Sequence, residues 1–311
     1  MKKCLISGLN GFAASHLAEA LLSTGRWEVY GTKRARSNNE NIAHIEGIKD
    51  IYVCDITDPY SVKEVVKKVQ PDAIFHLAAQ SFVPLSWKAP LMTFDTNVGG
   101  TINILEAARE MEVMPRVLVT SSSQVYGNAP IPFSLDTVPD PVNPYDVSKL
   151  AQELVAKSYF KSYGLPVVIT RAFNITGPRR QEFMAESSFA KQIVRCERGL
   201  QNEISVGNMD STRDYVDVRD VARAYMSVVE EGEAGKTYIL ASGVEHSMRE
   251  VLTKLLYFSP KAIPVAIDPK LLRPSDTPRM KGIPTDADWW FQTIPFEQSL
   301  LDLLNYHRLR I

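Results

Sequence analysis

Residues 3–14 read KCLISGLNGFAA, an apolar run that ends in glycine and passes at once into helix-forming residues. This pattern is typical of the first strand, turn and helix of a dinucleotide-binding unit. Gly8 permits the tight turn, and Gly11 lets backbone N–H groups approach a pyrophosphate at the helix N-terminus. The spacing is GxxGxxA, with Ala14 where a third glycine is usual, so the motif gains its meaning from the segments around it.

Short β-rich runs alternate with stretches of helical spacing through the first half of the chain. The expected strands are unbroken apolar runs, as is typical of strands buried on both faces. They lie at residues 3–7, 28–32, 51–54, 73–77, 117–120 and 167–170. The expected helices lie at residues 12–23, 61–69, 90–111 and 145–163. This order predicts an α/β fold, a Rossmann doubly wound parallel sheet with helices on both faces.

The alternation changes after about residue 174. Helices are expected at residues 187–198, 248–257 and 296–306, and two α/β pieces that can rejoin the main sheet at 215–230 and 237–241. We therefore predict a dinucleotide-binding Rossmann domain made of residues 1–173 and about 214–243. The other residues are expected to form a smaller, discontinuous C-terminal lobe that binds the substrate, at about 174–213 and 244–311.

The composition excludes several classes of protein. The 311 residues are 45% hydrophobic, and 35 Lys and Arg against 36 Asp and Glu leave a net charge of -1. A nucleic-acid-binding protein would carry a basic excess. No run of about 18 apolar residues predicts a membrane span. Three cysteines without CxxC spacing indicate buried thiols in a reducing cytoplasm, and no metal site is expected.

The end of the second expected strand bears on the choice of cofactor. An NAD-binding protein usually carries an acidic residue there for the ribose 2′-hydroxyl, whereas residues 33–36 read KRAR. A cationic cluster with Arg34 suits a 2′-phosphate, so NADP(H) is favoured and NAD(H) stays possible. Asp55 can hold the adenine amino group, and His76 is expected to be a core histidine. The residues expected at the cofactor are Gly8, Asn10, Gly11, Phe12, Arg34, Asp55, Ile56, Leu77, Ala78 and Ala79.

Tyr145 and Lys149 stand at i and i+4 at the start of an expected helix, so they share one helical face. The lysine ammonium is expected to lower the pKa of the phenol from about 10 and to prepare it for proton transfer. The same ammonium can reach the nicotinamide ribose, so both residues are also expected at the cofactor. Ser122 belongs to the TSSS sequence that ends the preceding strand, and a hydroxyl there can hydrogen-bond the reacting oxygen.

Together these motifs resemble the extended short-chain dehydrogenases/reductases (the NAD-dependent epimerase/dehydratase family) that act on nucleotide-activated sugars. The motifs are GxxGF at 8–12, HLAA at 76–79, SSSQVYG at 121–127, YDVSK at 145–149, RAFNITGP at 171–178, and residues 206–220 and 272–276. The resemblance implies that the catalytic residues are Ser122, Tyr145 and Lys149. It also implies that a GDP-sugar is bound by Ser81, Gln124, Asn174, Lys191, Arg213 and Arg273.

Residues 78–87 (AAQSFVPLSW) and 177–183 (GPRRQEF) are most similar to GDP-mannose 4,6-dehydratases and GDP-4-keto-6-deoxymannose reductases. The dehydratases carry a glutamate two residues after the catalytic hydroxyl, and this chain has Gln124 there. An amide cannot act as an acid or base near neutral pH. We therefore expect NADPH-dependent reduction of the C4 keto group of GDP-4-keto-6-deoxy-D-mannose to GDP-D-rhamnose. A nucleotide-sugar 4-epimerase is the first alternative, and a GDP-mannose 4,6-dehydratase is the second.

The resemblance also implies an assembly. It suggests a homodimer in which the helices expected at 90–111 and 145–163 pack as a four-helix bundle. A dinucleotide sensor without activity is a competitor from another class of protein. Such a sensor could lose the catalytic residues, and all three are present in this chain.

Overall fold

The computed structural model describes residues 1–271 and 277–311, and its centre is a seven-stranded sheet. The strand order is β10-β6-β5-β4-β1-β2-β3, and every neighbouring pair is parallel. The strands are β1 (Lys2–Ser7), β2 (Trp27–Lys33), β3 (Asp50–Val53), β4 (Ala73–His76), β5 (Arg116–Thr120), β6 (Val167–Ala172) and β10 (Thr237–Leu240). The predicted Rossmann sheet is confirmed, and its order reverses between β1 and β4.

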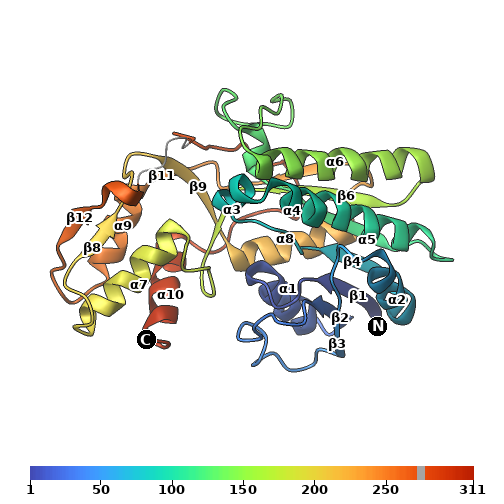
Figure 1. The fold of residues 1–311 in the computed structure, drawn as a ribbon, viewed down its shortest axis with the longest axis horizontal. Helices are drawn as coiled ribbons and strands as arrows, with labels where there is room; N and C mark the ends of the chain where they lie inside the picture. The colour runs from blue at the N-terminus through green and yellow to red at the C-terminus, as the bar shows by residue number, and fades with distance from the viewer. Residues whose placement is uncertain (272–276) are drawn as a thin grey trace.

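Helices cover both faces of this sheet (Figure 1). One face packs against α1 (Phe12–Ser23) and α8 (Val218–Glu231), and the other against α2 (Pro59–Val69), α5 (Gly100–Arg109) and α6 (Pro144–Tyr163). Alternate residues of a strand point to opposite faces. In β1, Cys4 and Ile6 accordingly join the first core and Leu5 joins the second. Burial on both faces explains why inner strands such as β4 and β6 are mainly apolar.

The helix predicted at residues 90–111 is present over residues 90–109, but a π-helical turn interrupts it. The segment forms α4 (Pro90–Phe94), a π-helical turn η1 (Asp95–Gly99) and α5, and α3 (Val83–Lys88) precedes it. The π turn carries Asn97 into the interior, where its side chain accepts from the N–H of Gln80 at 2.7 Å and donates to Ser148 Oγ at 2.9 Å. Apolar spacing does not reveal a π turn, because the extra residue leaves the helical spacing of apolar residues intact on each side of it.

Of the two later α/β segments predicted to rejoin the main sheet, only one contributes a strand to it. Residues 237–241 rejoin the main sheet as predicted, since β10 pairs with β6. The prediction for 215–230 is wrong for its strand: β9 (Thr212–Asp217) pairs with β7 (Asn174–Thr176) and β11 (Glu245–Ser247) in a separate sheet, although α8 packs on the main one. Buried Asp214 in β9 accepts from the N–H groups of Ser242 and Gly243 at 2.8 and 3.0 Å. These bonds hold β9 against the loop after β10 instead of in the main sheet.

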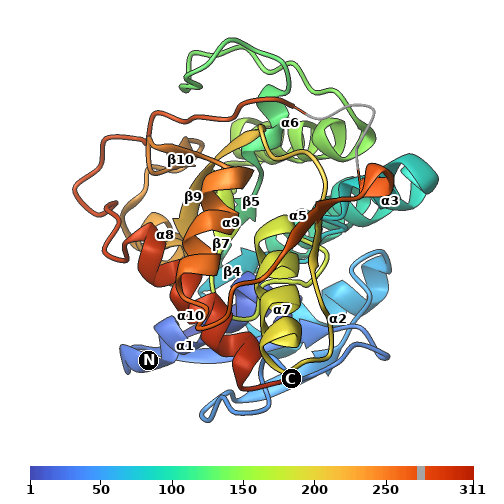
Figure 2. The ribbon, with the colours of Figure 1, turned by 90° about the vertical axis from the view of Figure 1, so that its left-hand side faces the viewer.

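The remaining elements form a smaller lobe beside the sheet (Figures 1 and 2). A third hydrophobic core lies among α7 (Ala185–Glu197), α9 (Met248–Tyr257), α10 (Phe296–Arg308) and β8 (Ile204–Val206), and β8 pairs with β12 (Val265–Ile267). Two short 3-10 turns are η2 (Ser123–Tyr126) and η3 (Pro269–Leu271). Within the described ranges, no helix is both long enough and apolar enough to cross a membrane.

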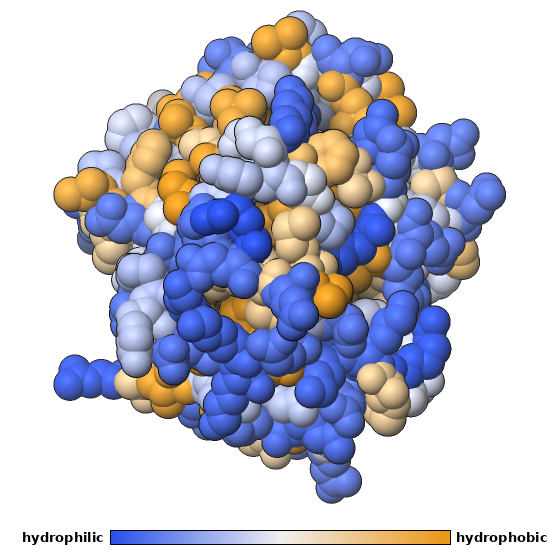
Figure 3. Space-filling view, turned by 90° about the vertical axis from the view of Figure 1, so that its right-hand side faces the viewer, coloured by the Kyte–Doolittle hydropathy of each residue, from blue (hydrophilic) through white to orange (hydrophobic). Residues whose placement is uncertain are grey.

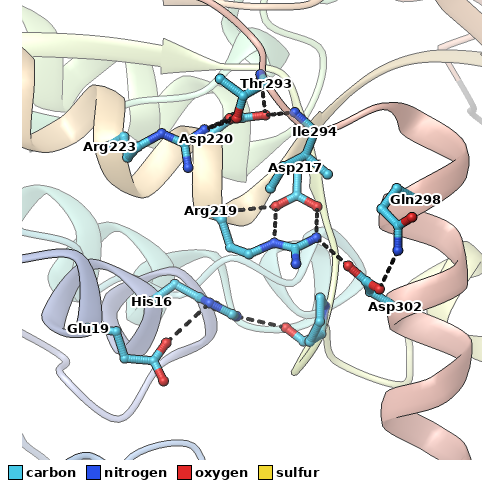
Figure 4. A network of polar contacts seen from close by, with 11 residues as sticks. His16, Glu19, Asp217, Arg219, Asp220, Arg223, Thr293, Ile294, Gln298 and Asp302 are labelled. Atoms are coloured by element: carbon cyan, nitrogen blue, oxygen red, sulfur yellow. Dashed lines mark hydrogen bonds and ion pairs between the residues drawn. The ribbon is translucent and has the colours of Figure 1, made fainter. Parts of the chain in front are cut away.

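Ion pairs and capping bonds connect the small lobe to α8 (Figure 4). Asp217 caps α8 by accepting from the N–H of Arg219 at 2.8 Å, and it also holds the Arg219 guanidinium. That guanidinium lies 2.7 Å from the carboxylate of Asp302 on α10. Asp220 accepts from the N–H of Ile294 at 3.1 Å. These bonds hold α10, and with it the small lobe, against α8.

Candidate active site

A cavity of about 1590 Å³ opens along the carboxyl ends of the parallel strands and continues into the small lobe. Its wall runs from Gly8 after β1 to Leu271 in the small lobe. The cavity borders the point between β1 and β4 where the strand order reverses, which is the usual ligand position in this architecture. One space is therefore in contact with both the sheet and the small lobe.

The wall formed by β1 and α1 fits the phosphates of a dinucleotide. Gly8 has a φ of +69°, and a Cβ there would lie 3.1 Å from Cα of Ala78, so the close approach of the two strand ends requires glycine. Gly11 is the N-cap of α1, and no side chain caps the first N–H groups of this helix. An uncapped helix N-terminus beside a cavity favours a bound anion.

The ten residues expected only at the cofactor all line this cavity: Gly8, Asn10, Gly11, Phe12, Arg34, Asp55, Ile56, Leu77, Ala78 and Ala79. Arg34 is exposed, Lys33 lines the same part of the wall, and Arg36 is not among the described lining residues. Asp55 accepts from the N–H and the hydroxyl of Thr57 at 3.0 and 2.8 Å, and these bonds lower the pKa of its carboxyl. The rim thus has cations where the sequence predicts a phosphate.

Ser122, Tyr145 and Lys149 lie together in the wall, between the dinucleotide side and the small lobe. Ser122 follows β5 and begins η2, and its Oγ accepts from the N–H of Gln124 at 3.2 Å. Tyr145 and Lys149 occupy the first two turns of α6, which begins at the N-cap Asn143. Both side chains are buried.

The prediction that Lys149 lowers the pKa of Tyr145 is wrong. Burial raises the pKa of Tyr145 to about 12, and the Ser122 hydroxyl and the Arg180 charge offset this rise only in part. Lys149 Nζ instead donates to the carbonyl oxygen of Thr120 at 2.7 Å. A shared helical face brings two side chains to one side of a helix without making them meet. Tyr145 therefore stays a protonated phenol near neutral pH.

A buried ion pair lies behind these three residues. Arg171 on β6 donates to both carboxylate oxygens of Glu153 on α6, at 2.9 and 2.7 Å. The two side chains are 7% and 1% exposed, so water does not screen the pair. Glu153 also accepts from the hydroxyl of Ser121 beside Ser122. The pair thereby fixes the end of β5 against α6, and so fixes Ser122 relative to Tyr145.

Only some of the residues expected at the sugar nucleotide line the cavity. Those that line the cavity are Ser81, Gln124, Asn174 and Arg213. Lys191 is not among the described lining residues, and its ammonium pairs with the carboxylate of Glu182. Arg273 lies outside the residues that the structure describes. Gln124 Nε2 donates to Sδ of Met280 at 3.3 Å.

Arg180 and Glu186 also line the cavity, although the sequence motifs predict no role for either. Arg180 Nε donates to Glu186 Oε1 at 3.0 Å, and the guanidinium lies 5.3 Å from the centroid of the Phe12 ring. The double arginine of GPRRQEF was a signal of anion chemistry, but spacing cannot tell which arginine faces the cavity. Arg179 instead donates to Glu19 on α1 at 2.7 and 2.8 Å.

The other singled-out residues belong to the interior. His76 is 1% exposed, as expected of a core histidine. Cys4, Cys54 and Cys196 are buried free thiols. In residues 1–271 and 277–311, no three His, Cys, Asp or Glu side chains form a group that could hold a metal ion.

Comparison with known proteins agrees with this site. A family model described as GDP-mannose 4,6 dehydratase matches residues 5–300. The chain is 31% identical to GDP-6-deoxy-D-mannose reductase of Pseudomonas aeruginosa, over 100% of this chain and 98% of the reductase. It is 29% identical to GDP-mannose 4,6-dehydratase of Yersinia enterocolitica, over 98% of this chain and 93% of the relative.

Two solved structures extend the comparison. The structure of RMD from Pseudomonas aeruginosa complexed with NADPH is 30% identical, covers 100% of both chains and has a TM-score of 0.87. UDP-glucose 4-epimerase of Thermus thermophilus in complex with NAD is 28% identical, covers 99% of this chain and 100% of its own, and has a TM-score of 0.89. The fold, the cavity and these similarities lead to one assignment: the chain belongs to the GDP-mannose 4,6-dehydratase family of extended short-chain dehydrogenases/reductases.

Proposed function

We propose that this protein reduces the C4 keto group of GDP-4-keto-6-deoxy-D-mannose with NADPH and forms GDP-D-rhamnose. The observation that carries the proposal is the single cavity in which Ser122, Tyr145 and Lys149 lie between a dinucleotide wall and the small lobe. The full-length similarity to a GDP-6-deoxy-D-mannose reductase supports it. The buried free thiols suit a reducing compartment, and we place the enzyme in the cytoplasm.

The two parts of the chain bind different molecules in the proposed reaction. Residues 1–173 and about 214–243 hold NADPH, and about 174–213 and 244–311 hold the GDP-sugar. Contacts to the cofactor come from Gly8, Asn10, Gly11, Phe12, Arg34, Asp55, Ile56, Leu77, Ala78, Ala79, Tyr145 and Lys149. Contacts to the sugar nucleotide come from Ser81, Gln124, Asn174 and Arg213, with Lys191 and Arg273 as further candidates for the diphosphate.

The three catalytic residues have separate tasks. NADPH, when bound, supplies the hydride for C4. Tyr145 donates its phenolic proton to the C4 oxygen, and the pKa of about 12 keeps that proton in place until the oxygen becomes basic. Ser122 donates a hydrogen bond to the same oxygen, and Lys149 holds the nicotinamide ribose.

The alternatives demand chemistry that this site supplies less well. A dehydratase needs an acid/base group to remove the C5 proton, and Gln124, whose amide contacts Met280, cannot titrate near neutral pH. A 4-epimerase of this family usually uses NAD, whereas the cationic Arg34 at the rim of the cavity suits the 2′-phosphate of NADPH.

The first test follows NADPH oxidation on mixing with GDP-4-keto-6-deoxy-D-mannose. Wild-type protein is expected to consume one NADPH per sugar reduced, and Tyr145→Phe to lower kcat by about 10²- to 10⁴-fold because the proton donor is lost. Binding of NADPH should persist in this variant, as fluorescence titration would show. Interconversion of 4-epimers without NADPH consumption would support the epimerase instead, and dehydration of GDP-mannose would support the dehydratase.

The second test concerns the cofactor phosphate. Arg34→Ala is expected to raise the Kd for NADPH about 10- to 100-fold, because a guanidinium–phosphate contact is lost, and to leave the Kd for NADH unchanged. Arg36→Ala is the matched control, since Arg36 is not among the described lining residues. Equal losses for NADPH and NADH would contradict the assignment of Arg34 to the 2′-phosphate.

We also propose that the protein is a homodimer joined through α4, α5 and α6. Exposed apolar side chains of α4 and α6 include Leu91, Val147 and Leu154, which are 73%, 40% and 60% exposed. On the face that Figure 3 shows, hydrophilic side chains cover most of the lower half and apolar groups are more frequent in the upper half. Association through the apolar side would bury these residues from water.

This assembly is tested by light scattering coupled to gel filtration. Wild-type protein should have twice the mass of one chain, and Leu154→Glu should have the mass of one, because a carboxylate would be buried at the interface. Leu309→Glu is the matched control at an exposed position after α10. A dimer that survives Leu154→Glu would contradict this interface.

A further inference from the structure

The ammonium of Lys149 is held by two neutral oxygen atoms. Nζ donates to the carbonyl oxygen of Thr120 at 2.7 Å and to Oε1 of Gln152 at 2.8 Å. Lys149 is 3% exposed and Gln152 is 1% exposed. Burial lowers the pKa of Lys149 to about 8. These two acceptors and the nearby Glu153 carboxylate offset the cost of burying the charge.

The amide of Gln152 joins this ammonium to a longer chain of hydrogen bonds. Nε2 of Gln152 donates to Oγ1 of Thr101 at 2.6 Å, and that oxygen lies 3.0 Å from Nε2 of His76. Nδ1 of His76 lies 2.8 Å from Oγ of Ser7 at the end of β1. All four side chains are buried, so water does not compete for these bonds.

The directions of the bonds follow from the available protons. The hydroxyl of Thr101 donates to the carbonyl oxygen of Asn97 at 2.6 Å, so it accepts from both Gln152 and His76. His76 therefore carries its proton on Nε2 and accepts at Nδ1 from the hydroxyl of Ser7. Burial lowers the pKa of His76 to about 3, which keeps the imidazole in the neutral form that this arrangement needs.

The far end of the chain returns to the cavity wall. Oγ of Ser7 accepts from the N–H groups of Leu77 and Ala78, each at 3.0 Å, and both residues line the cavity. The bonds thus connect Lys149 with the segment after β4 through buried groups alone. Each link has one satisfied arrangement of donors and acceptors, so a shift at one end would break a bond.

We propose that Gln152 is the positioning residue for Lys149: its amide ties the ammonium to the Thr101–His76–Ser7 chain and so holds it where the nicotinamide ribose binds. This inference rests on the proposed function for the identity of the cofactor. Gln152 acts only through Lys149 and does not line the described cavity. Its role is to set the place and the charge of the ammonium.

The titration of Lys149 supplies a specific readout. The charged ammonium donates to the ribose more strongly than the neutral amine, so NADPH binding should weaken as the pH rises through the pKa of Lys149. The other groups whose charge acts here are Glu153 on α6, paired with Arg171 on β6, and His76 on β4, which is neutral. None of these three changes in the Gln152 variants.

The experiment measures the Kd for NADPH without sugar, by fluorescence titration from about pH 6 to about pH 10. Gln152→Leu removes the acceptor, so Kd should rise about tenfold and the alkaline loss of binding should move to lower pH. Gln152→Glu adds a negative charge beside the ammonium, so the alkaline loss should move to higher pH. Gln298→Leu, at an exposed position on α10, is the matched control and should behave as wild type.

The proposal is supported if the pH at which NADPH binding is lost moves in opposite directions in the two variants. A merely structural role for Gln152 would not make the direction of this shift depend on the charge of the substituted side chain. Unchanged profiles, or shifts in the same direction, would overturn it. If Gln152→Leu does not fold, as judged by circular dichroism, the shift in Gln152→Glu decides alone. A wild-type protein that binds NADPH with this pH dependence but reduces no keto sugar would refute the proposed function and leave this inference standing.

Discussion

A lysine ammonium with 3% exposure must meet oxygen atoms at hydrogen-bond distance, because an unpaired buried charge costs several kcal/mol. For Lys149 these atoms come from the end of β5 and from the next turn of α6. The Arg171–Glu153 pair holds the neighbouring strand β6 against the same helix, and the Ser121 hydroxyl after β5 bonds to the same carboxylate. The sheet and the helix are therefore placed relative to each other by the charges at the site as well as by the apolar core. The position of Ser122 and Tyr145 follows from that placement.

The same burial acts in opposite directions on the two titratable residues of the site. It raises the pKa of Tyr145 and lowers the pKa of Lys149, since it disfavours the charged form of each. The phenol accordingly holds its proton near neutral pH while much of the lysine stays charged. Such a pair is suited to donate a proton to an oxygen that gains charge as a hydride arrives. Gln124 adds no base to this arrangement, which agrees with reduction and not dehydration.

Much of the fold follows from local pattern. Unbroken apolar strands between amphipathic helices predict the parallel sheet, and the glycines of residues 8–11 predict the turn where β1 and β4 approach. Hydrogen bonds between segments that are distant in sequence determine the features that the local pattern does not predict. The π turn at Asn97 and the diversion of β9 by Asp214 both depend on hydrogen bonds to distant backbone groups.

The candidate site, too, is predicted in part by local sequence and determined in part by tertiary contacts. Motifs place Ser122, Tyr145 and Lys149 in one cavity, because the strand-end and helix-start positions are read directly from the sequence. The direction of the Lys149 side chain depends on Thr120 and Gln152, so i, i+4 spacing gives the wrong cause for the pKa of Tyr145. Likewise, the spacing of two arginines cannot show that the second one lines the cavity.

In the proposed reaction, the hydride passes directly from the dinucleotide to C4 of the keto sugar within this cavity. The most direct measurement uses NADPH carrying deuterium at C4 of the nicotinamide, prepared with the label on each face in turn, and GDP-4-keto-6-deoxy-D-mannose in ordinary water. Direct transfer requires that one of the two labelled cofactors gives a product with deuterium at C4 of the sugar, as read by mass spectrometry and NMR. A product without deuterium at C4 from either cofactor would contradict it.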